Sequence, residues 1–209
     1  MYVPNHFRAQ SEDELYAVID RYMFATVISA VDGASPRATM VPFVAREDGG
    51  RRRLWGHMAR ANPHWRDFQP VREILVVFRG PHTYISPSWY ADEPNVPTWN
   101  FVVVHVYGRP RLLEPDDPRV LWVLEQTVEQ AEARTARPWQ LAQAGDYARQ
   151  LAPGVAAFEI EVARVEGSLK LSQNHPRENR RGVIAALAAS ESSDAREIAD
   201  LMRARDAAS

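Results

Sequence analysis

Residues 80–108 carry an unusual number of aromatic side chains between two segments with strand character. The stretch reads GPHTYISPSWYADEPNVPTWNFVVVHVYG, and its rings are those of Tyr84, Trp89, Tyr90, Trp99, Phe101 and Tyr107, with His82 and His105 towards the two ends. A proline-rich loop with two tryptophans is costly to leave in water, because aromatic side chains bury large areas and favour a flat partner. The loop therefore folds back on the core, meets another chain, or lies against a planar ligand.

Length and composition limit the class of protein. The chain has 209 residues, which fits one large domain or one domain with appendages. Its formal net charge of −2 argues against a nucleic-acid-binding surface as the main feature, since such surfaces are usually strongly basic. The absence of cysteine excludes disulfides, thiolate nucleophiles and zinc–thiolate sites, and it fits a cytoplasmic protein. No basic and apolar leader follows Met1, and no apolar run approaches the roughly 20 residues that span a bilayer, so we expect neither a signal peptide nor a membrane partner.

Hydrophobic periodicity and turn signals predict a succession of strands with helices between the later ones. Strands are expected at 24–31, 37–45, 51–58, 74–78, 82–86, 99–113, 155–165 and 169–172. Helices are expected at 11–22, 63–68, after Pro118, near Tyr147, at 176–189 and from Asp194. Pro42 indicates an edge or a bulge, and residues 47–50 form a hairpin signal.

This order of elements predicts an α+β fold that is mainly antiparallel β and closed as a small barrel. The capping signals are Ser11 with Glu14, Asn62 before Pro63, Asp117 before Pro118, and Asp194 with Glu197. We expect one domain over residues 1–190. We expect residues 191–209 to form a C-terminal helical appendage, with the polar stretch 190–194, SESSD, as a hinge before its helix.

The segment 57–63, HMARANP, is a candidate phosphate site, because it lies where a predicted strand ends and a helix begins. Free backbone N–H groups and the positive end of a helix favour an anion there. Arg60 adds a group that can contact a phosphate through two hydrogen bonds. The alternative is a surface arginine beside an ordinary capped helix.

Two tryptophans of the opening stretch, Trp89 and Trp99, are candidates for the wall of a planar-ring site. Thr98 and Asn100 stand beside Trp99 and could hydrogen-bond the polar edge of such a ring. The alternative is a loop folded on the core. For a metal site the chain offers only histidines without metal-ligand spacing or a carboxylate cluster, so no metal is expected.

The segment 170–174, KLSQN, contains the only lysine among 25 basic residues. A buried lysine on a strand, followed by side-chain amides, could hold an anion or a ring carbonyl, and the alternative is a solvated strand end. The spacing of residues shows no Ser/His/Asp group and no paired carboxylates in an apolar setting, so it predicts no hydrolytic mechanism.

Taken together, five motifs resemble the PaiB-like family of FMN-binding negative transcriptional regulators. They are MYVPNHF, GHMARANPHWRDF, GPHTYISPSWY, VPTWNFVVVHVYG and KLSQNHPRENRRGVI, and they follow in the family's order from residue 1 to about 190. The resemblance implies a split β-barrel of the flavin reductase and pyridoxamine-phosphate oxidase type. It also implies a homodimer with FMN in a cleft between the subunits.

The same resemblance implies which residues bind FMN. Residues of the second predicted strand run along the isoalloxazine, those after the third cradle the ribityl phosphate, and the later ones approach and close the site. The implied set is Thr39, Met40, Val41, Pro42, His57, Met58, Ala59, Arg60, Ala61, Asn62, Trp89, Thr98, Trp99, Asn100, Lys170, Gln173 and Asn174. The chain departs from the family pattern at Met40, where a polar residue is expected, and at Arg79, where glutamine is expected.

Three functions follow from the resemblance. The first is a flavin-linked sensor or negative transcriptional regulator, in which residues 80–108 form a dimer-interface arm that also walls the flavin pocket. Direct DNA contact is not expected, because the chain is slightly acidic and has no helix-turn-helix signature. The second is an FMN-dependent NAD(P)H oxidoreductase acting on a small molecule. The third is a haem-binding protein, with His57 and His105 as the available axial ligands.

Overall fold

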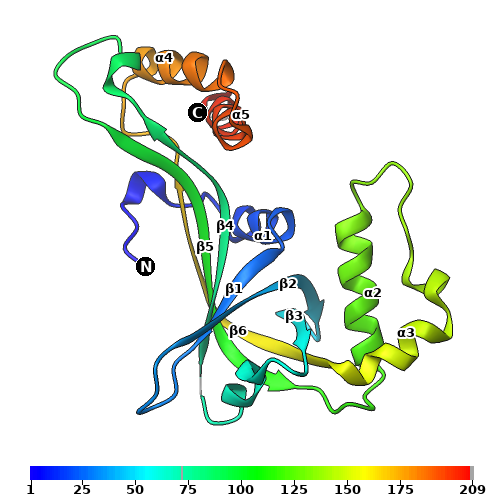
Figure 1. Ribbon diagram of the computed structural model, residues 1–209. Helices are drawn as coiled ribbons and strands as arrows, with labels where there is room; N and C mark the ends of the chain where they lie inside the picture. Colours follow the sequence, from blue (N-terminus) through cyan, green and yellow to red (C-terminus); the bar gives the residue numbers. More distant parts are fainter. Residues whose placement is uncertain (72, 208–209) are drawn as a thin grey trace. The chain divides into compact units, whose positions relative to one another are not determined.

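The computed structural model describes residues 1–71 and 73–207, and six strands form its centre. The strands are β1 (Phe24–Ser29), β2 (Arg37–Asp48), β3 (Arg51–Ala59), β4 (Ile74–Ile85), β5 (Thr98–Leu112) and β6 (Val155–Lys170). They form a closed barrel in the order β1-β2-β3-β6-β5-β4, and β1 with β2, β1 with β4, β2 with β3 and β3 with β6 pair antiparallel (Figure 1). Closure removes the unpaired edges of a sheet. The predicted class, α+β and mainly antiparallel β closed as a barrel, is confirmed.

Helices and short helical turns connect and flank the strands. The α-helices are α1 (Glu12–Arg21), α2 (Arg119–Glu132), α3 (Asp146–Leu151), α4 (Arg177–Ala188) and α5 (Ser193–Ala207). The 3-10 turns are η1 (Asn5–Phe7), η2 (Pro63–Phe68), η3 (Pro87–Trp89), η4 (Leu141–Ala144) and η5 (Ala152–Gly154). A helix with the length and apolarity to cross a membrane does not occur within the described residues.

The chain divides into two compact units, which are described separately. The barrel unit comprises Tyr16–Phe78 and His105–Val165, and the terminal unit comprises Met1–Leu15, Arg79–Val104 and Glu166–Ser209. Along the sequence, β4, β5 and β6 each pass from one unit into the other. The strand pairings given below all lie in the barrel unit.

In the barrel unit, β2 changes its partner at Pro42. Its first half pairs with β1 as far as Phe24 opposite Pro42, and its second half pairs with β3 from Phe43 opposite Gly56. Proline has no N–H to give to a ladder, so it fits a strand at the point where the pairing changes. The Phe43 N–H donates instead to the Met23 carbonyl at 2.8 Å. Beyond this point, Gly49 and Gly50 adopt positive φ and form the predicted hairpin turn to β3.

Phenylalanine rings fill the inside of the barrel unit. Phe43 makes edge contacts with Phe78 and Phe158, with ring centroids 5.7 and 5.9 Å apart, and Phe68 contacts Phe158 at 4.9 Å. Edge-to-face geometry is favourable for such rings beyond the area they bury. Gly56 makes room for them, because a Cβ there would lie 2.9 Å from Phe43 and 3.0 Å from Phe158.

Helix α2 covers an outer face of the barrel unit. Its buried Val120 and Val123 pack with Val44 of β2 and Trp55 of β3 in one apolar cluster. Trp122 adds an edge contact to Trp55 at 5.0 Å. The predicted cap is present, since the Asp117 carboxylate accepts from the Arg119 N–H at 2.9 Å.

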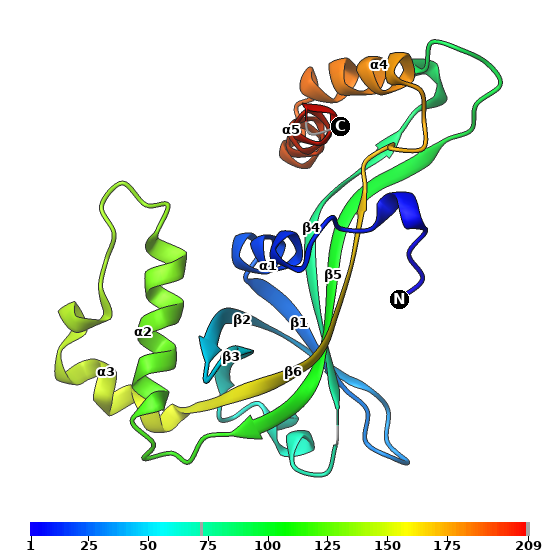
Figure 2. The ribbon, with the colours of Figure 1, turned by 180° about the vertical axis from the view of Figure 1, so that it is seen from behind.

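In the terminal unit, α4 and α5 pack side by side (Figure 1, Figure 2). Ile198 and Met202 of α5 are buried, as are Val183 and Leu187 of α4. Gly182 lets α4 approach η3 closely, because a Cβ there would lie 2.1 Å from the Trp89 carbonyl oxygen. The helix α5, predicted as an appendage, thus packs on this unit through a buried face, and the domain boundary at residue 190 stays a prediction.

Differences from the predicted elements have local causes. Strands expected at 74–78 and 82–86 form the single strand β4, because the φ of Pro81 is compatible with extended backbone. Strands expected at 155–165 and 169–172 form the single strand β6. There Gly167 serves close packing, since a Cβ would lie 2.2 Å from Leu15. The expected Asp194 cap is wrong: Ser192 accepts from the Ala195 N–H, while Asp194 accepts from the His82 N–H.

Gly56→Ala is expected to lower the free energy of unfolding by about 1–3 kcal/mol, because its methyl group overpacks the phenylalanine cluster. Gly154→Ala is the matched control, since a Cβ there has nothing within 4 Å. Urea denaturation of both variants tests this. Equal stability of the two would show that the barrel interior has room that the packing distances do not indicate.

Candidate cofactor site

The sequence-predicted cofactor residues divide between the two units. Those of the barrel unit are residues 39–42 and 57–62, and those of the terminal unit are Trp89, Thr98, Trp99, Asn100, Lys170, Gln173 and Asn174.

On β2 and β3, the predicted residues alternate between the inside and the outside of the barrel. Val41 and Met58 are buried, so their side chains belong to the interior. Met40 is 57% exposed, and Thr39, Pro42 and His57 are half-buried. Only the outward side chains, together with the backbone, can contact a cofactor here.

The turn after β3 is held firmly on the barrel unit. Arg60 donates through Nη2 to the Val155 carbonyl at 2.8 Å and through Nε to the Pro153 carbonyl at 3.2 Å. Its own carbonyl accepts from the Trp65 indole N–H at 2.9 Å. These contacts use two of the guanidinium nitrogens, and for Nη1 the described residues provide no hydrogen-bond partner. One nitrogen of a fixed cation thus remains for an anionic ligand.

A fully buried histidine anchors this turn. His64 Nε2 lies 2.9 Å from Ser29 Oγ, and Nδ1 lies 2.7 Å from Thr39 Oγ1. Ser29 donates to Asp67 at 2.9 Å, while Thr39 accepts from the Asn62 amide at 3.2 Å. The hydrogens are consistent if Nε2 carries the imidazole proton and donates to Ser29, with the Thr39 hydroxyl donating to Nδ1.

This network is structural and not a hydrolytic triad. Asp67 accepts from Ser29 instead of orienting His64, and both Ser29 and His64 are buried. The network fixes the position of the Asn62 side chain. This side chain accepts a hydrogen bond from the His64 N–H at 3.0 Å and so caps η2. The predicted Asn62 cap is confirmed.

His57 offers an enclosed polar atom beside this turn. Its Nδ1 is buried, and the described part of the chain gives it no hydrogen-bond partner. Burial lowers the pKa of His57, so the ring is neutral at physiological pH. An enclosed nitrogen without a partner, next to a fixed arginine, fits a ligand with phosphate oxygens or hydroxyl groups.

The terminal unit contains a cavity of about 460 Å³ that collects several predicted residues. Residues of the N-terminal segment, the proline-rich loop and the end of β6 line it: His6, Phe7, Pro94, Asn95, Val96, Pro97, Thr98, Asn100, Lys170, Ser172, Asn174 and His175. The predicted residues Thr98, Asn100, Lys170 and Asn174 are thus brought together. Its size lies in the range of small-molecule sites.

Lys170 supplies the charge of this cavity. Its ammonium donates to Thr98 Oγ1 at 2.5 Å and lies 5.6 Å from the centre of the Phe7 ring. Burial lowers the pKa of Lys170 below its ordinary value, and no carboxylate lines the cavity. A partly desolvated ammonium without a counterion attracts an anion or a carbonyl oxygen.

Asn100 and Ser172 form the buried polar floor beside Lys170. The Asn100 amide donates to Ser172 Oγ at 2.9 Å, and Ser172 takes a positive φ of 63°, a conformation that is uncommon outside glycine. Such strain persists only where the surroundings hold it, and it is frequent at ligand sites. Gln173 differs from its neighbours, because its amide bonds the backbone of Leu169 and Leu171.

The two tryptophans have different surroundings. Trp89 lies in η3 against α4, through the close approach at Gly182. Trp99 is 52% exposed, stacks on His82 with ring centroids 6.0 Å apart, and meets the edge of Tyr84 at 6.2 Å. Trp99 therefore presents an aromatic surface to the outside of the terminal unit.

The fold and the donor groups define the class of protein. A closed antiparallel barrel with peripheral helices agrees with the split β-barrel that the sequence resemblance implies. In the barrel unit, Arg60 and His57 can hydrogen-bond a phosphate or a hydroxyl group, and in the terminal unit Lys170 can contact an anion or a carbonyl oxygen. In the described residues, no cluster of three or more His, Asp or Glu side chains could hold a metal ion.

Comparison with known proteins gives the family. Residues 1–164 match the model described as "Putative FMN-binding domain". The chain is 34% identical over 204 residues to the protease synthase and sporulation protein PAI 2 of Bacillus subtilis (strain 168), covering 97% of this chain and 96% of that one. The chain therefore belongs to the PaiB-like family of FMN-binding proteins. The family model and the Bacillus relative thus confirm the predicted family and its cofactor, FMN.

Solved structures agree on the fold. The FAD- and haem-binding protein from Mycobacterium smegmatis has a TM-score of 0.56 at 17% identity, over 78% of this chain and 73% of that one. The flavocytochrome Anf3 from Azotobacter vinelandii has a TM-score of 0.54 at 16% identity, over 80% of this chain and 72% of that one. At these identities the likeness concerns the fold alone.

Sequence reasoning missed residues that the fold brings to these groups. His64 lay inside a quoted motif but carried no role, although its place two residues after the capping Asn62 is a usable signal. His6 and Phe7 line the Lys170 cavity from far away in the sequence, and no local pattern reveals this.

His64 should make the stability of the protein pH-dependent. Burial is the main cause that lowers its pKa, Asp67 opposes this and Arg37 adds to it. The unfolded chain takes up a proton near the ordinary pKa of 6.5 while the folded protein resists it, so stability present above pH 6.5 is lost as pH falls below it. One such proton contributes at most about 1.4 kcal/mol per pH unit.

Urea denaturation between pH 7.5 and 5 measures this slope. His64→Gln is expected to flatten it, whereas His6→Gln, on the N-terminal segment, removes a histidine outside the network and serves as control. An unchanged slope in His64→Gln would assign the acid sensitivity to other groups.

Proposed function

We propose that this protein is an FMN-binding homodimer that works as a flavin-linked sensor of the PaiB-like regulator type. The observation that carries the proposal is the cavity at Lys170. Four residues expected from the sequence to bind the cofactor meet there, around the Lys170 ammonium, and none of the described lining residues is an Asp or Glu. The family membership supports FMN as the ligand.

FMN supplies one- and two-electron redox chemistry when bound, and the chain's own residues bind and orient it. Lys170, held by Thr98, provides a positive charge for an anionic or carbonyl oxygen of the flavin. Arg60, whose Nε and Nη2 are held by backbone carbonyls, keeps Nη1 as a donor for an anionic group such as a phosphate. Each of the two groups is a candidate binding element within its own unit, and each can be tested by itself.

The homodimer part of the proposal is supported by exposed apolar side chains in the barrel unit. Phe24 of β1 and Met40 of β2 are each 57% exposed. In the ladder of β1 and β2, Phe24 lies opposite Pro42, and Met40 lies opposite Thr26. Opposite residues share a face and so do residues two apart, so Phe24 and Met40 lie on the same outer face. Clustered apolar side chains on a surface mark a contact site, and a second copy of the chain is the occupant proposed here.

The regulatory part rests on the Bacillus relative, which is named for protease synthesis and sporulation. A net charge of −2 does not favour direct binding to DNA. We propose that regulation runs through a partner protein or a metabolite, with the flavin as the sensing group. A gel shift with promoter DNA that persists at moderate salt would contradict the indirect route.

The FMN-dependent NAD(P)H oxidoreductase is the second candidate, and it shares the same site. Steady-state oxidation of NADPH by the FMN-loaded protein, compared with free FMN, separates it from a sensor. Haem binding is a third candidate, supported by the enclosed His57 nitrogen, and a Soret band on addition of haem tests it.

Lys170→Gln is expected to weaken FMN binding roughly tenfold, because a hydrogen bond to a charged group is lost. Titration of FMN fluorescence gives the dissociation constant. Arg149→Gln, an exposed charge removal on α3 outside the predicted set, is the matched control and should bind as the unaltered protein does. Arg60→Gln tests the phosphate turn in the same assay. If neither variant differs from the control, the predicted residues do not hold FMN.

Trp99→Ala is expected to weaken both FMN binding and dimerisation, because this exposed ring is predicted to wall the flavin and to meet the second subunit. Trp139→Ala removes a ring that is 42% exposed outside residues 80–108 and serves as control. Light scattering coupled to size exclusion gives the mass, and the FMN titration gives the affinity. If Trp99→Ala changes neither, the 80–108 loop is only packing.

A further inference from the structure

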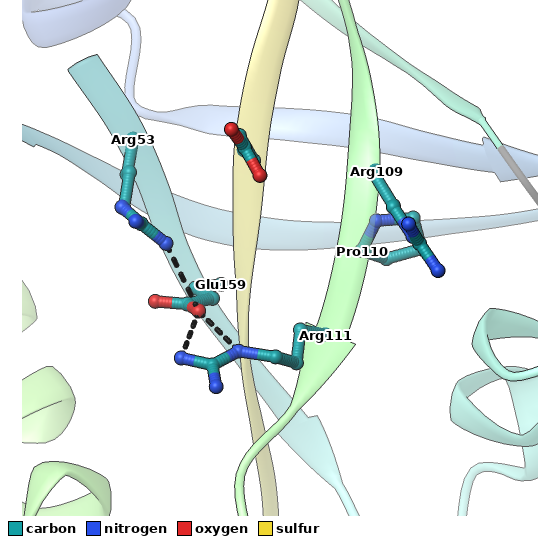
Figure 3. Close-up of a pocket in the computed structure, with 6 residues that line it drawn as sticks. Arg53, Arg109, Pro110, Arg111 and Glu159 are labelled. Atoms are coloured by element: carbon teal, nitrogen blue, oxygen red, sulfur yellow. Dashed lines mark hydrogen bonds and ion pairs between the residues drawn. The ribbon is translucent and has the colours of Figure 1, made fainter. Parts of the chain in front are cut away.

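A second cavity lies in the barrel unit and shares no residue with the predicted cofactor set. It has a volume of about 430 Å³ and is lined by Arg53 of β3, Arg109, Pro110 and Arg111 of β5, and Glu159 and Glu161 of β6 (Figure 3). The three strands are neighbours in the barrel order. Its lining is almost entirely charged, with proline as the one apolar residue.

A buried carboxylate organises this cavity. The Glu159 side chain is 2% exposed, and its Oε1 pairs with Arg53 Nη1 at 3.1 Å and with Arg111. Figure 3 shows these two arginines reaching Glu159 from β3 and β5. Because one carboxylate oxygen holds two guanidinium groups, both cations are fixed in place before any ligand arrives.

The second carboxylate oxygen of Glu159, Oε2, is not used by Arg53 or Arg111. Oε2 is buried and accepts no hydrogen bond from the described residues, and the Arg119 guanidinium stands 3.9 Å away. A buried acceptor without a donor is costly, and native proteins usually satisfy it. Because Glu159 is among the residues that line the cavity, this oxygen is the acceptor that its side chain has left for an O–H or N–H donor of a bound molecule.

Arg109 provides a separate cation. It is exposed on β5, and no ion pair to it occurs among residues 1–71 and 73–207. Figure 3 shows it apart from the Glu159 cluster. The other carboxylate of the lining, Glu161, is engaged by Arg51 at 2.7 Å, so it does not neutralise Arg109.

Gly108 makes this arrangement possible. A Cβ at this position would lie 2.4 Å from the Glu161 carbonyl oxygen and 2.6 Å from Ile160. Only glycine lets β5 approach β6 this closely, and the residues that follow immediately are Arg109 to Arg111. The close approach of β5 to β6 thus comes immediately before the β5 residues that line the cavity.

We propose that this cavity binds a small polar organic anion that also carries an O–H or N–H donor. Its carboxylate or phosphate group contacts Arg109, and its donor contacts Glu159 Oε2. The absence of aromatic and large aliphatic lining favours a ligand without an apolar body. Such a site would give a flavin protein a separate place to receive a metabolite signal, and it does not depend on where FMN binds.

Isothermal titration of the full chain with matched probes tests the proposal. The carboxylate pair is 3-hydroxybutyrate and butyrate, and the phosphate pair is 2-hydroxyethyl phosphate and ethyl phosphate. Within a pair, the charge is the same and only the first compound carries the alcohol O–H donor. The donor-bearing member of at least one pair should bind roughly tenfold more tightly than its partner, as a hydrogen bond to a charged group requires. The pair that binds identifies the anionic group.

Two variants locate the binding. Arg109→Gln removes a cation that holds no partner, so the protein should fold normally and lose roughly tenfold in affinity for the bound probe. Glu159→Gln keeps the shape of the side chain and should abolish the advantage of the donor-bearing member. Arg149→Gln, on α3, loses the same charge outside the cavity and should bind as the unaltered protein does.

Three results would overturn the proposal. They are the absence of millimolar binding by all four probes, equal affinity of Arg109→Gln and Arg149→Gln, and a donor advantage that survives in Glu159→Gln. Thermal unfolding of each variant shows whether it is folded, and the Arg109→Gln comparison decides the matter even if Glu159→Gln is destabilised.

Discussion

The barrel depends on how Phe43 and Gly56 fit together. They face each other at the point where β2 leaves β1 for β3, and the space that glycine leaves is filled by the rings of Phe43 and Phe158. Pro42 lies where the pairing partner changes, because it has no N–H to lose. Closure also requires the pairings of β1 with β4 and of β3 with β6, and it leaves alternate side chains of β2 and β3 on the outside of the barrel.

Glycines also allow two close approaches of the backbone, one beside the Glu159 cavity and one between α4 and η3. Gly108 brings β5 against β6 beside the Glu159 cluster, and Gly182 brings α4 against η3 in the terminal unit. In both places a side chain as small as alanine would meet backbone atoms, which cannot move aside as a flexible side chain does. The polar groups are then placed by strands and helices with little freedom, as binding sites require.

Short-range signals in the sequence predicted the local structure well. The hairpin at residues 47–50 and the caps at Asn62 and Asp117 depend on neighbouring residues only, and they are present. Contacts between residues that are far apart in the sequence could not be predicted in this way. Gly167 lies between two predicted strands and suggests a break, yet in the structure it leaves space for the side chain of Leu15, which is far away in the sequence. Val41 and Met58 were assigned to the cofactor by resemblance, but barrel curvature turns both side chains inward, and only pairing registers reveal that.

The terminal unit contains the only lysine of the chain, at the wall of its cavity. Lys170 is therefore the only lysine side chain of this sequence that an amine-directed reagent can modify. The α-amino group of Met1 pairs with Glu166, whereas Lys170 faces the cavity with a hydroxyl as its neighbour. The lowered pKa of Lys170 favours the unprotonated, nucleophilic amine. The extent of acylation of the peptide that contains Lys170, measured by mass spectrometry, thus reports whether this cavity is occupied. No engineered label is needed.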